Sequence, residues 1–503
     1  MPKRHAVVAG AGIGGLTAAL ALHRRGWQVT VCERAPEPPT TGAGIGLAPN
    51  ALRALDAIGS DAAHAVGSAV PATMGVRRSD GQWLTRVDTA DMAARYGVPP
   101  IAVPRPAFTA ALAAALPPEA VRYGTAVTGV DDDGGRPTVR TAVGLDLPAD
   151  LVVAADGIHS PLRRAHFPAH PGLHYLGETA WRTIVDAPDL RIPAMSETWG
   201  RGERFGVTPL SDGRFYLYAT AVAPAGTRSA DPRAELHHRF GSWHDPIPAL
   251  LDRVRRLDRA DLLQNDLYDL AAPLPRLHHG RIAWLGDAAH AMAPNLGQGG
   301  CQAIEDAVVL AHLLPAGDGA DSTDSVPAAL TAYTAARRPH RRRTRPRPPG
   351  RPLGRTASPA HGGHPRPRGP CHPRAPGPAR HGRPLQRLPP PRVAATRGLP
   401  SSKPRRARRG LGRRGRFQPP FPSHGMRHNR HPADDPLHVI QEIRDGQYEA
   451  FQQSFAALFL PISRCSSDHG SSRSQNSSPP FPAPRRLWYR WLKPFASSKA
   501  PPP

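Results

Sequence analysis

The stretch AVVAGAGIGG, residues 6–15, decides the fold. Its apolar half predicts a strand, and its second half predicts a tight turn into an Ala- and Leu-rich helix over residues 16–25. Four glycines form that turn: Gly10, Gly12, Gly14 and Gly15. In such a loop the glycines permit the turn, the close approach of a pyrophosphate, and tight packing of helix on strand. Free amides at the helix start would face the phosphates.

An acidic residue follows the next expected strand, residues 27–32. Glu33 stands about 20 residues after the glycines, where a carboxylate accepts hydrogen bonds from ribose hydroxyls. We assign Glu33 and the adjacent Arg34 to a cofactor, and FAD and NAD satisfy this pattern equally. The glycine spacing alone means little, because GLGRRG at residues 410–415 repeats it with no strand before it. We interpret that second match as chance.

Three later segments carry more information. They are LVVAADGIHSPLR at residues 151–163, which contains Asp156; IAWLGDAAH at 282–290, which contains Gly286 and Asp287; and PNLGQGG at 294–300, which contains Pro294, Gly297, Gly299 and Gly300. A helix is expected after them, over residues 301–314. In this order and at this spacing, the motifs resemble the class A FAD-dependent monooxygenases of the p-hydroxybenzoate and salicylate hydroxylase type. The resemblance covers about residues 5–339 and ends with a helix expected over residues 328–338.

The resemblance implies an α/β fold, in which a Rossmann-like FAD-binding domain carries an inserted β-sheet substrate domain, as in p-hydroxybenzoate hydroxylase. We expect the FAD-binding monooxygenase domain to span residues 1–339. The substrate-side sheet would lie within about 70–100 and 170–275. Residues 204–210 and 214–220 predict a hairpin. Its inner face, with Tyr216 or Tyr218, would meet the substrate.

Several residues have two interpretations. Asp287 would accept a hydrogen bond from the ribityl chain of FAD, or would cap a helix. Asp156 would lie near the FAD pyrophosphate and the nicotinamide cofactor, or would form a solvated ion pair with Arg163. Arg105 opens an Ala-rich helix as a cofactor contact or as a surface arginine. We assign His290 no catalytic role.

The glycines at 297–300 would leave bare backbone beside the flavin ring. The positive end of the following helix would stabilise negative charge on the reduced ring. The sequence identifies no catalytic residue, and we expect no metal.

The implied reaction consumes NADPH or NADH and O2. The nicotinamide cofactor reduces FAD, O2 gives a flavin C4a-hydroperoxide, and one oxygen atom is delivered to an aromatic or polyketide-like small molecule. The pocket must be dry for this chemistry. An FAD-dependent reductase or dehydrogenase on the same scaffold is the alternative.

The charge of +25 belongs to the end of the chain. Residues 1–339 carry 32 Lys and Arg against 34 Asp and Glu, whereas the remainder carries 33 against 6. Residues 340–433 are basic and rich in Pro and Arg, as in a disordered arm. We favour a frameshift in GC-rich DNA, which would make an inactive product a further alternative. Residues 434–464 could form a short helical element, and 465–503 are expected to be disordered.

Partners and compartment follow from composition. An interaction protein that binds nucleic acid through its basic arm ranks last. Four scattered cysteines, with neither metal-ligand spacing nor a disulfide framework, fit a reducing compartment. No stretch reaches the roughly 18 apolar residues that a membrane span needs. We therefore expect a cytoplasmic enzyme that does not contact membranes.

Overall fold

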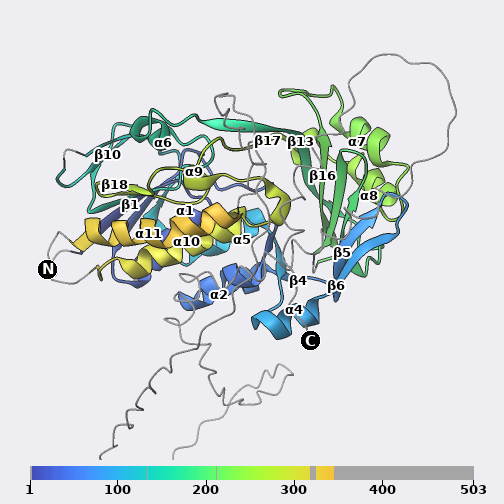
Figure 1. The fold of residues 1–503 in the computed structure, drawn as a ribbon, viewed down its shortest axis with the longest axis horizontal. Helices are drawn as coiled ribbons and strands as arrows, with labels where there is room; N and C mark the ends of the chain where they lie inside the picture. Colours follow the sequence, from blue (N-terminus) through green and yellow to red (C-terminus); the bar gives the residue numbers. More distant parts are fainter. Residues whose placement is uncertain (1–2, 133, 211, 318–324, 345–503) are drawn as a thin grey trace, which may run out of the picture. The chain divides into compact units, whose positions relative to one another are not determined.

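The computed structural model describes residues 3–132, 134–210, 212–317 and 325–344. Its secondary structure is arranged around two large sheets, one toward each side of the view in Figure 1. Residues 340–344, the start of the segment expected to be a disordered arm over 340–433, lie in a helix, α11 (Ser325–Thr344). The rest of that segment and the predictions for 434–464 and 465–503 lie outside the described residues.

The first sheet has six strands and is parallel except at one edge. Its central strands are short runs of Val, Ala and Leu that are buried on both faces, which is the usual pattern of a parallel sheet covered by helices. In spatial order the strands are β18 (His278–His279), β19 (Ile282–Trp284), β12 (Leu151–Ala154), β1 (His5–Ala9), β2 (Gln28–Cys32) and β8 (Val121–Arg122).

Helices cover one face of this sheet, and Figure 1 shows α10 and α11 side by side below it. Residues 301–311 of α10 are all buried, because this helix packs against α1, α2 and α11 together. None of the described helices is long and apolar enough to cross a membrane. The covering helices are α1 (Ile13–Arg24), α2 (Pro49–Ala57), α5 (Arg105–Ala114), α10 (Gly299–Leu313) and α11 (Ser325–Thr344).

Smaller elements complete this part. A three-stranded antiparallel meander lies on the opposite side of the sheet from α10 and α11 (Figure 1). It consists of β9 (Val127–Asp131), β10 (Thr138–Thr141) and β11 (Asp146–Pro148). A second small sheet has the order β3 (Gly44–Leu47), β7 (Ile101–Pro104) and β4 (Ser68–Ala69). The short helices are α3 (Ala62–Val66), α4 (Thr89–Tyr96), α6 (Pro161–His166), α9 (Asp287–His290), η1 (Pro118–Ala120), η2 (Arg259–Asp261) and η3 (Pro294–Leu296).

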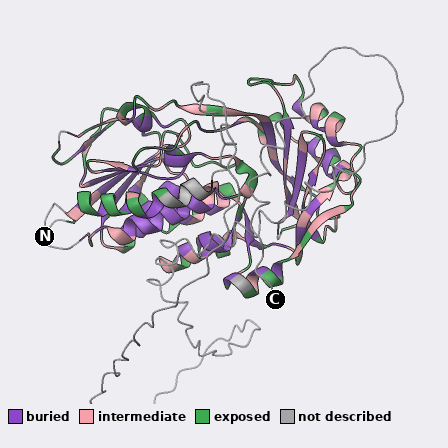
Figure 2. Ribbon diagram, in the orientation of Figure 1, coloured by how far each residue is buried: buried purple, intermediate pink, exposed green. Residues whose placement is uncertain are grey.

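The second large sheet has seven strands and is antiparallel except where β14 pairs with β5. Its strands, in spatial order, are β17 (Leu263–Leu270), β13 (Leu173–Asp186), β16 (Arg214–Val222), β15 (Glu203–Pro209), β14 (Ala194–Trp199), β5 (Thr73–Arg78) and β6 (Trp83–Asp88). Helices α7 (Pro232–Phe240) and α8 (Ile247–Val254) pack on one face of it and form a separate hydrophobic core. Figure 2 shows buried residues running along the strands of both large sheets.

The predicted fold class is confirmed for the described residues: a Rossmann-like α/β domain with an inserted β-sheet. The predicted hairpin is confirmed as β15 and β16, which pair antiparallel. The expected helix over residues 16–25 begins earlier, at Ile13, so Gly14 and Gly15 belong to the helix rather than to the turn. The helix expected from residue 301 likewise begins at Gly299.

Substitution of Phe240 provides a test of the hydrophobic core between the seven-stranded sheet and helices α7 and α8. Its side chain is fully buried, and its ring centroid lies 5.3 Å from that of Phe205 and 4.9 Å from that of Trp243. Replacement of Phe240 by Ala should lower the free energy of unfolding by about 3–5 kcal/mol, because it leaves a cavity between helix and sheet. Val222→Ala is the matched control, since Val222 is 54% exposed. Urea unfolding of the full chain measures both, and equal effects would contradict the assignment of Phe240 to a core.

Candidate functional site

The turn from β1 into α1 brings three backbone segments into contact. Gly10 has a φ of +104°, and a Cβ there would lie 2.5 Å from the carbonyl oxygen of Ala155. A Cβ on Gly15 would lie 2.0 Å from the carbonyl oxygen of Gly10. In contrast, a Cβ on Gly12 would meet nothing within 4 Å. Gly10 and Gly15 are therefore required by packing, whereas Gly12 leaves open space in front of the α1 amides.

Glu33 is held in place by this turn. Its carboxylate accepts hydrogen bonds from the backbone N–H of Ala11 at 2.7 Å and of Ala35 at 2.9 Å. The side chain is thus fixed beside the glycine loop, with lone pairs left for a ligand hydroxyl. Arg34, the next residue, is exposed.

Gly286 and Asp287 form a sharp turn at the end of β19. Gly286 has a φ of +57° and is the residue that precedes α9, while Asp287 is the first residue of that helix. No side chain caps α9, so the interpretation of Asp287 as a helix cap is wrong. The carboxylate of Asp287 is exposed instead, because the turn carries it to the carboxyl edge of the sheet.

The start of α10 faces the same place. Gly297 adopts the left-handed conformation, with a φ of +61°, and lets the chain turn into the helix. A Cβ on Gly300 would lie 2.6 Å from the side chain of Ile45, whereas the nearest atom to a Cβ on Gly299 would be Asp287 Oδ1 at 4.0 Å. The start of this 15-residue helix, with its free N–H groups and positive end, therefore lies close to Asp287.

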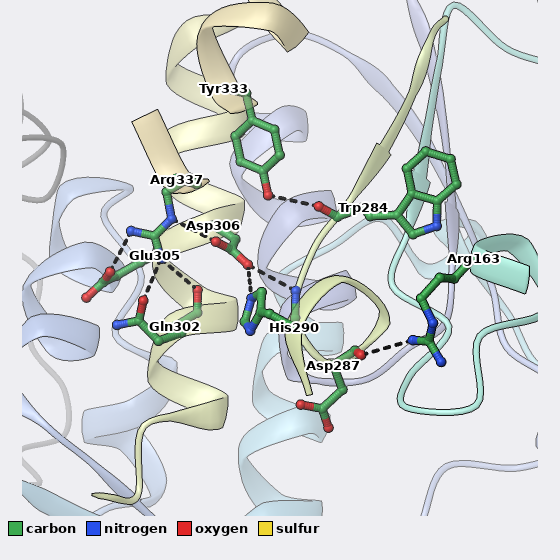
Figure 3. Close-up of polar contacts among 10 residues, drawn as sticks. Arg163, Trp284, Asp287, His290, Gln302, Glu305, Asp306, Tyr333 and Arg337 are labelled. Atoms are coloured by element: carbon green, nitrogen blue, oxygen red, sulfur yellow. Dashed lines mark hydrogen bonds and ion pairs between the residues drawn. The ribbon is translucent and has the colours of Figure 1, made fainter. Parts of the chain in front are cut away.

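Arg163 links the two motifs. It is buried, and its Nη1 donates to the carbonyl oxygens of Ala288 at 2.9 Å and Asp287 at 3.3 Å (Figure 3). The interpretation of Asp156 and Arg163 as a solvated ion pair is therefore wrong. Asp156 itself accepts a hydrogen bond from the backbone N–H of Leu162, near the start of α6.

A cavity of about 910 Å³ joins these elements to the second sheet. Eleven of the residues assigned to the cofactor from the sequence line it: Gly12, Gly14, Gly15, Glu33, Arg105, Gly286, Asp287, Pro294, Gly297, Gly299 and Gly300. Gly10, Arg34 and Asp156 do not line it. Both interpretations of Arg105 hold in part, because its side chain is exposed and also borders the cavity.

The far end of the cavity is formed by the seven-stranded sheet. In β16, Phe215, Leu217 and the following alternate residues enter the core under α7 and α8, so Tyr216, Tyr218 and Thr220 face the cavity. Neighbouring strands add charged and apolar groups. Those groups are Arg182 of β13, Met195 and Glu197 of β14, Arg204 of β15, Leu267 of β17 and Met74 of β5.

Arg204 is the central charge at this end and was missed from the sequence. It is buried and forms an ion pair with Glu178 at 2.6 Å. It also donates to Asn295 Oδ1 at 3.0 Å, which connects the sheet to the segment before α10. Burial opposes the charge, but the carboxylates of Glu197 and Glu178 raise the pKa of Arg204 above its ordinary value. The guanidinium is therefore a permanent cation.

The rings of two cavity tyrosines pack directly against glycine residues. A Cβ on Gly44 would lie 2.4 Å from the ring of Tyr216, and a Cβ on Gly206 would lie 2.0 Å from the ring of Tyr218. The Tyr218 hydroxyl donates to Glu197 Oε2 at 2.5 Å. Burial, together with that carboxylate, raises the pKa of Tyr218 well above its ordinary value. Burial also raises the pKa of Tyr216, while Arg182 acts in the opposite direction.

Among the residues that the structure describes, no group of three or more His, Cys, Asp or Glu side chains could hold a metal ion. His290 is buried behind the Gly286 turn, with its Nε2 2.6 Å from Asp306 Oδ2.

The glycine loop yields a paired prediction. Gly15→Ala should destabilise the protein without any ligand, because its Cβ would collide with the Gly10 carbonyl. Gly12→Ala should leave that stability unchanged and weaken the binding of FAD, the ligand expected from the resemblance, since its methyl group projects into free space at the phosphate end. Thermal unfolding and flavin fluorescence titration measure the two effects. Equal FAD affinity of Gly12→Ala and wild type would contradict the assignment.

Asp156 yields a pH prediction. Burial is the largest influence on this carboxyl and raises its pKa, against the hydrogen bonds and Arg163, which lower it. The folded chain then holds the Asp156 proton more tightly than the unfolded chain, whose pKa is about 3.9. The tighter proton binding of Asp156 therefore stabilises the folded chain fully below the unfolded pKa, and this stabilisation is lost as the pH rises through the raised pKa of the folded chain.

Asp156→Asn, which cannot ionise, should therefore unfold at a higher temperature than wild type at pH 7. The difference should shrink as the pH falls toward 4. Thermal midpoints of the FAD-free protein between pH 4 and pH 8 measure this, and parallel profiles for the two proteins would contradict the raised pKa.

A family model described as an FAD binding domain matches residues 3–345. The chain is 38% identical over 333 residues to the aurachin C monooxygenase/isomerase of Stigmatella aurantiaca, and this match covers 66% of the chain and 84% of the relative. It is 33% identical over 337 residues to the FAD-dependent urate hydroxylase of Klebsiella pneumoniae, covering 66% and 85%.

The fold is shared with a solved structure, Klebsiella pneumoniae HpxO complexed with FAD and uric acid. The TM-score is 0.61 at 32% identity, over 67% of this chain and 85% of that chain. The open backbone at Gly12, the anchored Glu33 and the start of α10 fit FAD, which is the cofactor of this family. The chain belongs to the class A FAD-dependent monooxygenases.

Proposed function

We propose that this chain uses NADH or NADPH and O2 to hydroxylate a polar aromatic small molecule at its FAD. One observation carries the proposal: a single cavity extends from the glycine loop and the α10 start to the polar face of the seven-stranded sheet. An oxygenase needs its organic substrate beside the flavin. A cavity of about 910 Å³ bordered by both elements has room for a ring system at the junction.

We assign the cofactor contacts as follows. The α1 amides at Gly12 would bind the pyrophosphate, Glu33 the adenosine ribose, and Asp287 the ribityl chain. The positive end of α10 at Gly299 would stabilise negative charge on the reduced ring. Bound FAD supplies the oxygen chemistry, and the protein supplies position, electrostatics and exclusion of water. Three further residues would lie beside these contacts without lining the cavity: Gly10, Arg34 and Asp156.

The substrate end favours a flat ring with oxygen or nitrogen acceptors. Arg182, Arg204 and Tyr216 place hydrogen-bond donors on one wall of the cavity, and methionine and leucine side chains add apolar surface. The names of relatives agree with this chemistry, because they include urate and 6-hydroxynicotinate enzymes. We therefore propose a hydroxylated or oxo-substituted aromatic or heteroaromatic substrate.

The test uses the purified full chain with FAD, NADH or NADPH, and ¹⁸O2. Phenols, hydroxypyridines, purines and quinolones form the substrate panel. The expected result is substrate-dependent oxidation of the nicotinamide cofactor with one ¹⁸O atom in the product by mass spectrometry. Oxidation of NAD(P)H without incorporation would instead identify an FAD-dependent reductase or dehydrogenase. Absence of any turnover in an FAD-loaded chain would favour an inactive product.

Tyr216 provides a site-directed prediction for this function. Tyr216→Phe removes a hydroxyl at the substrate end and should lower kcat/KM by at least tenfold while leaving the Kd for FAD unchanged. Tyr175→Phe is the control, because Tyr175 lies on the same sheet but does not line the cavity. Steady-state kinetics and flavin titration of both variants decide the matter. An equal loss of kcat/KM in the two variants would contradict a role for Tyr216 toward substrate.

A further inference from the structure

Arg337 on α11 is a fully enclosed charge behind the Gly286 turn and the start of α10. Its side chain has no exposed surface. Nε lies 2.7 Å from Asp306 Oδ1, Nη1 lies 2.7 Å from Glu305 Oε2, and Nη2 donates to Gln302 Oε1 at 2.9 Å. All three partners lie on α10, as Figure 3 shows. One guanidinium therefore joins the two helices through three side chains.

Asp306 connects Arg337 to the turn at Gly286. Its second oxygen, Oδ2, accepts the backbone N–H of Gly286 at 3.0 Å and lies 2.6 Å from His290 Nε2. Gly286 precedes α9 and His290 ends it, so one carboxylate holds both sides of the turn that presents Asp287. Tyr333, one helical turn before Arg337 on α11, donates to the carbonyl oxygen of Trp284 at 3.0 Å.

Glu305 connects Arg337 to the start of α10. Its Oε1 accepts a hydrogen bond from Asn50 Nδ2 at 2.5 Å, and Asn50 Nδ2 also lies 3.1 Å from Gln298 Oε1. Gln298 is the residue that precedes α10, and Asn50 lies in the first turn of α2, just after β3. The chain of contacts from Arg337 therefore ends at the side chain of Gln298, directly before Gly299 and Gly300.

The charges in this cluster depend on one another. Asp306 has no exposed surface and Glu305 is 3% exposed, so neither carboxylate is solvated. Removing the cation from a buried carboxylate strongly destabilises the protein, because the remaining charge has no partner and no solvent. The planar guanidinium also supplies donors in several directions at once, whereas an ammonium group is a point charge. A lysine at this position would keep the charge and lose part of the geometry.

We propose that Arg337 is a positioning residue for FAD. Through Asp306 and Glu305 it fixes the turn at Gly286 and the start of α10, which are the two segments that present Asp287 and Gly299 to the cofactor. A residue that served only to pack α11 on α10 would affect the stability of the protein equally with and without cofactor. The inference rests on the proposed function only in requiring that the chain binds FAD.

The experiment compares Arg337→Lys and Arg337→Met with Arg338→Met in the full chain. Arg338 is the adjacent arginine on α11 and is exposed, so it controls for loss of a positive charge. The readouts are the Kd for FAD by flavin fluorescence, the visible absorption bands of bound flavin, and the thermal midpoint of the FAD-free protein. None of them requires turnover.

We expect Arg337→Lys to keep most of the FAD-free thermal midpoint, to raise the Kd for FAD at least tenfold and to shift the flavin bands toward those of free FAD. Arg338→Met should match wild type in all three readouts. Glu305→Gln keeps the shape of the side chain, weakens its ion pair with Arg337 and its contact with Asn50, and leaves the Asp306 branch in place, so it should raise the Kd to a smaller extent. If Arg337→Met does not fold, the Kd of Glu305→Gln for FAD tests the proposal in its place.

Wild-type FAD affinity and spectra in Arg337→Lys and Glu305→Gln would overturn the proposal, whatever their thermal midpoints. An equal loss of affinity in Arg338→Met would overturn it as well. The proposed function fails separately: a wild-type chain that binds FAD but incorporates no oxygen contradicts the monooxygenase reaction and leaves the role of Arg337 intact. A wild-type chain that does not bind FAD contradicts both.

Discussion

The cofactor side of the molecule depends on a steric constraint, the contact of bare backbone where β1, α1 and β12 meet. Gly15 lies against the carbonyl of Gly10, and Gly10 lies against the carbonyl of Ala155, at distances that leave no room for a methyl group. This contact lets α1 begin directly at the sheet edge. Because the strands around it are parallel, the Gly286 turn ends at that same edge, and the amides of α1 and the carboxylate of Asp287 border one cavity.

Buried arginines between two carboxylates occur on both sides of that cavity. Arg204 lies between Glu178 and Glu197 in the seven-stranded sheet, and Arg337 lies between Glu305 and Asp306 behind the Gly286 turn and the start of α10. Such clusters contribute little net stability, because desolvation offsets most of the attraction. Their value is geometric, since each group tolerates few arrangements of its partners. Both clusters end on segments next to the start of α10: Arg204 on Asn295, and Arg337 through Asn50 on Gln298.

The sequence predicted what depends on local backbone geometry. The glycine turn and the turn at Gly286 are each encoded in a short local stretch, Glu33 is marked by its spacing of about 20 residues from the glycines, and the hairpin of β15 and β16 is marked by its alternation. Arg182 was missed because β13 pairs with β16 and β17, which are distant in sequence, and Arg204 because its partners Glu178 and Asn295 are 26 and 91 residues away. Arg337 was seen only as part of a helix, since its partners lie about 31 residues earlier. Arg163 was misjudged because burial by Asp287 and Ala288 leaves no local signal.

The cavity has a thermodynamic consequence, because its lining passes from the glycine loop to Tyr216 and Tyr218 without interruption. With FAD at one end, the face of the ring itself would complete the enclosure around the substrate. Two ligands that share a wall in this way have coupled affinities, and the coupling is equal in both directions. The substrate would then bind weakly to the protein without FAD, and bound substrate would tighten the binding of FAD by the same factor. The shape of the fold would thus couple the two binding equilibria.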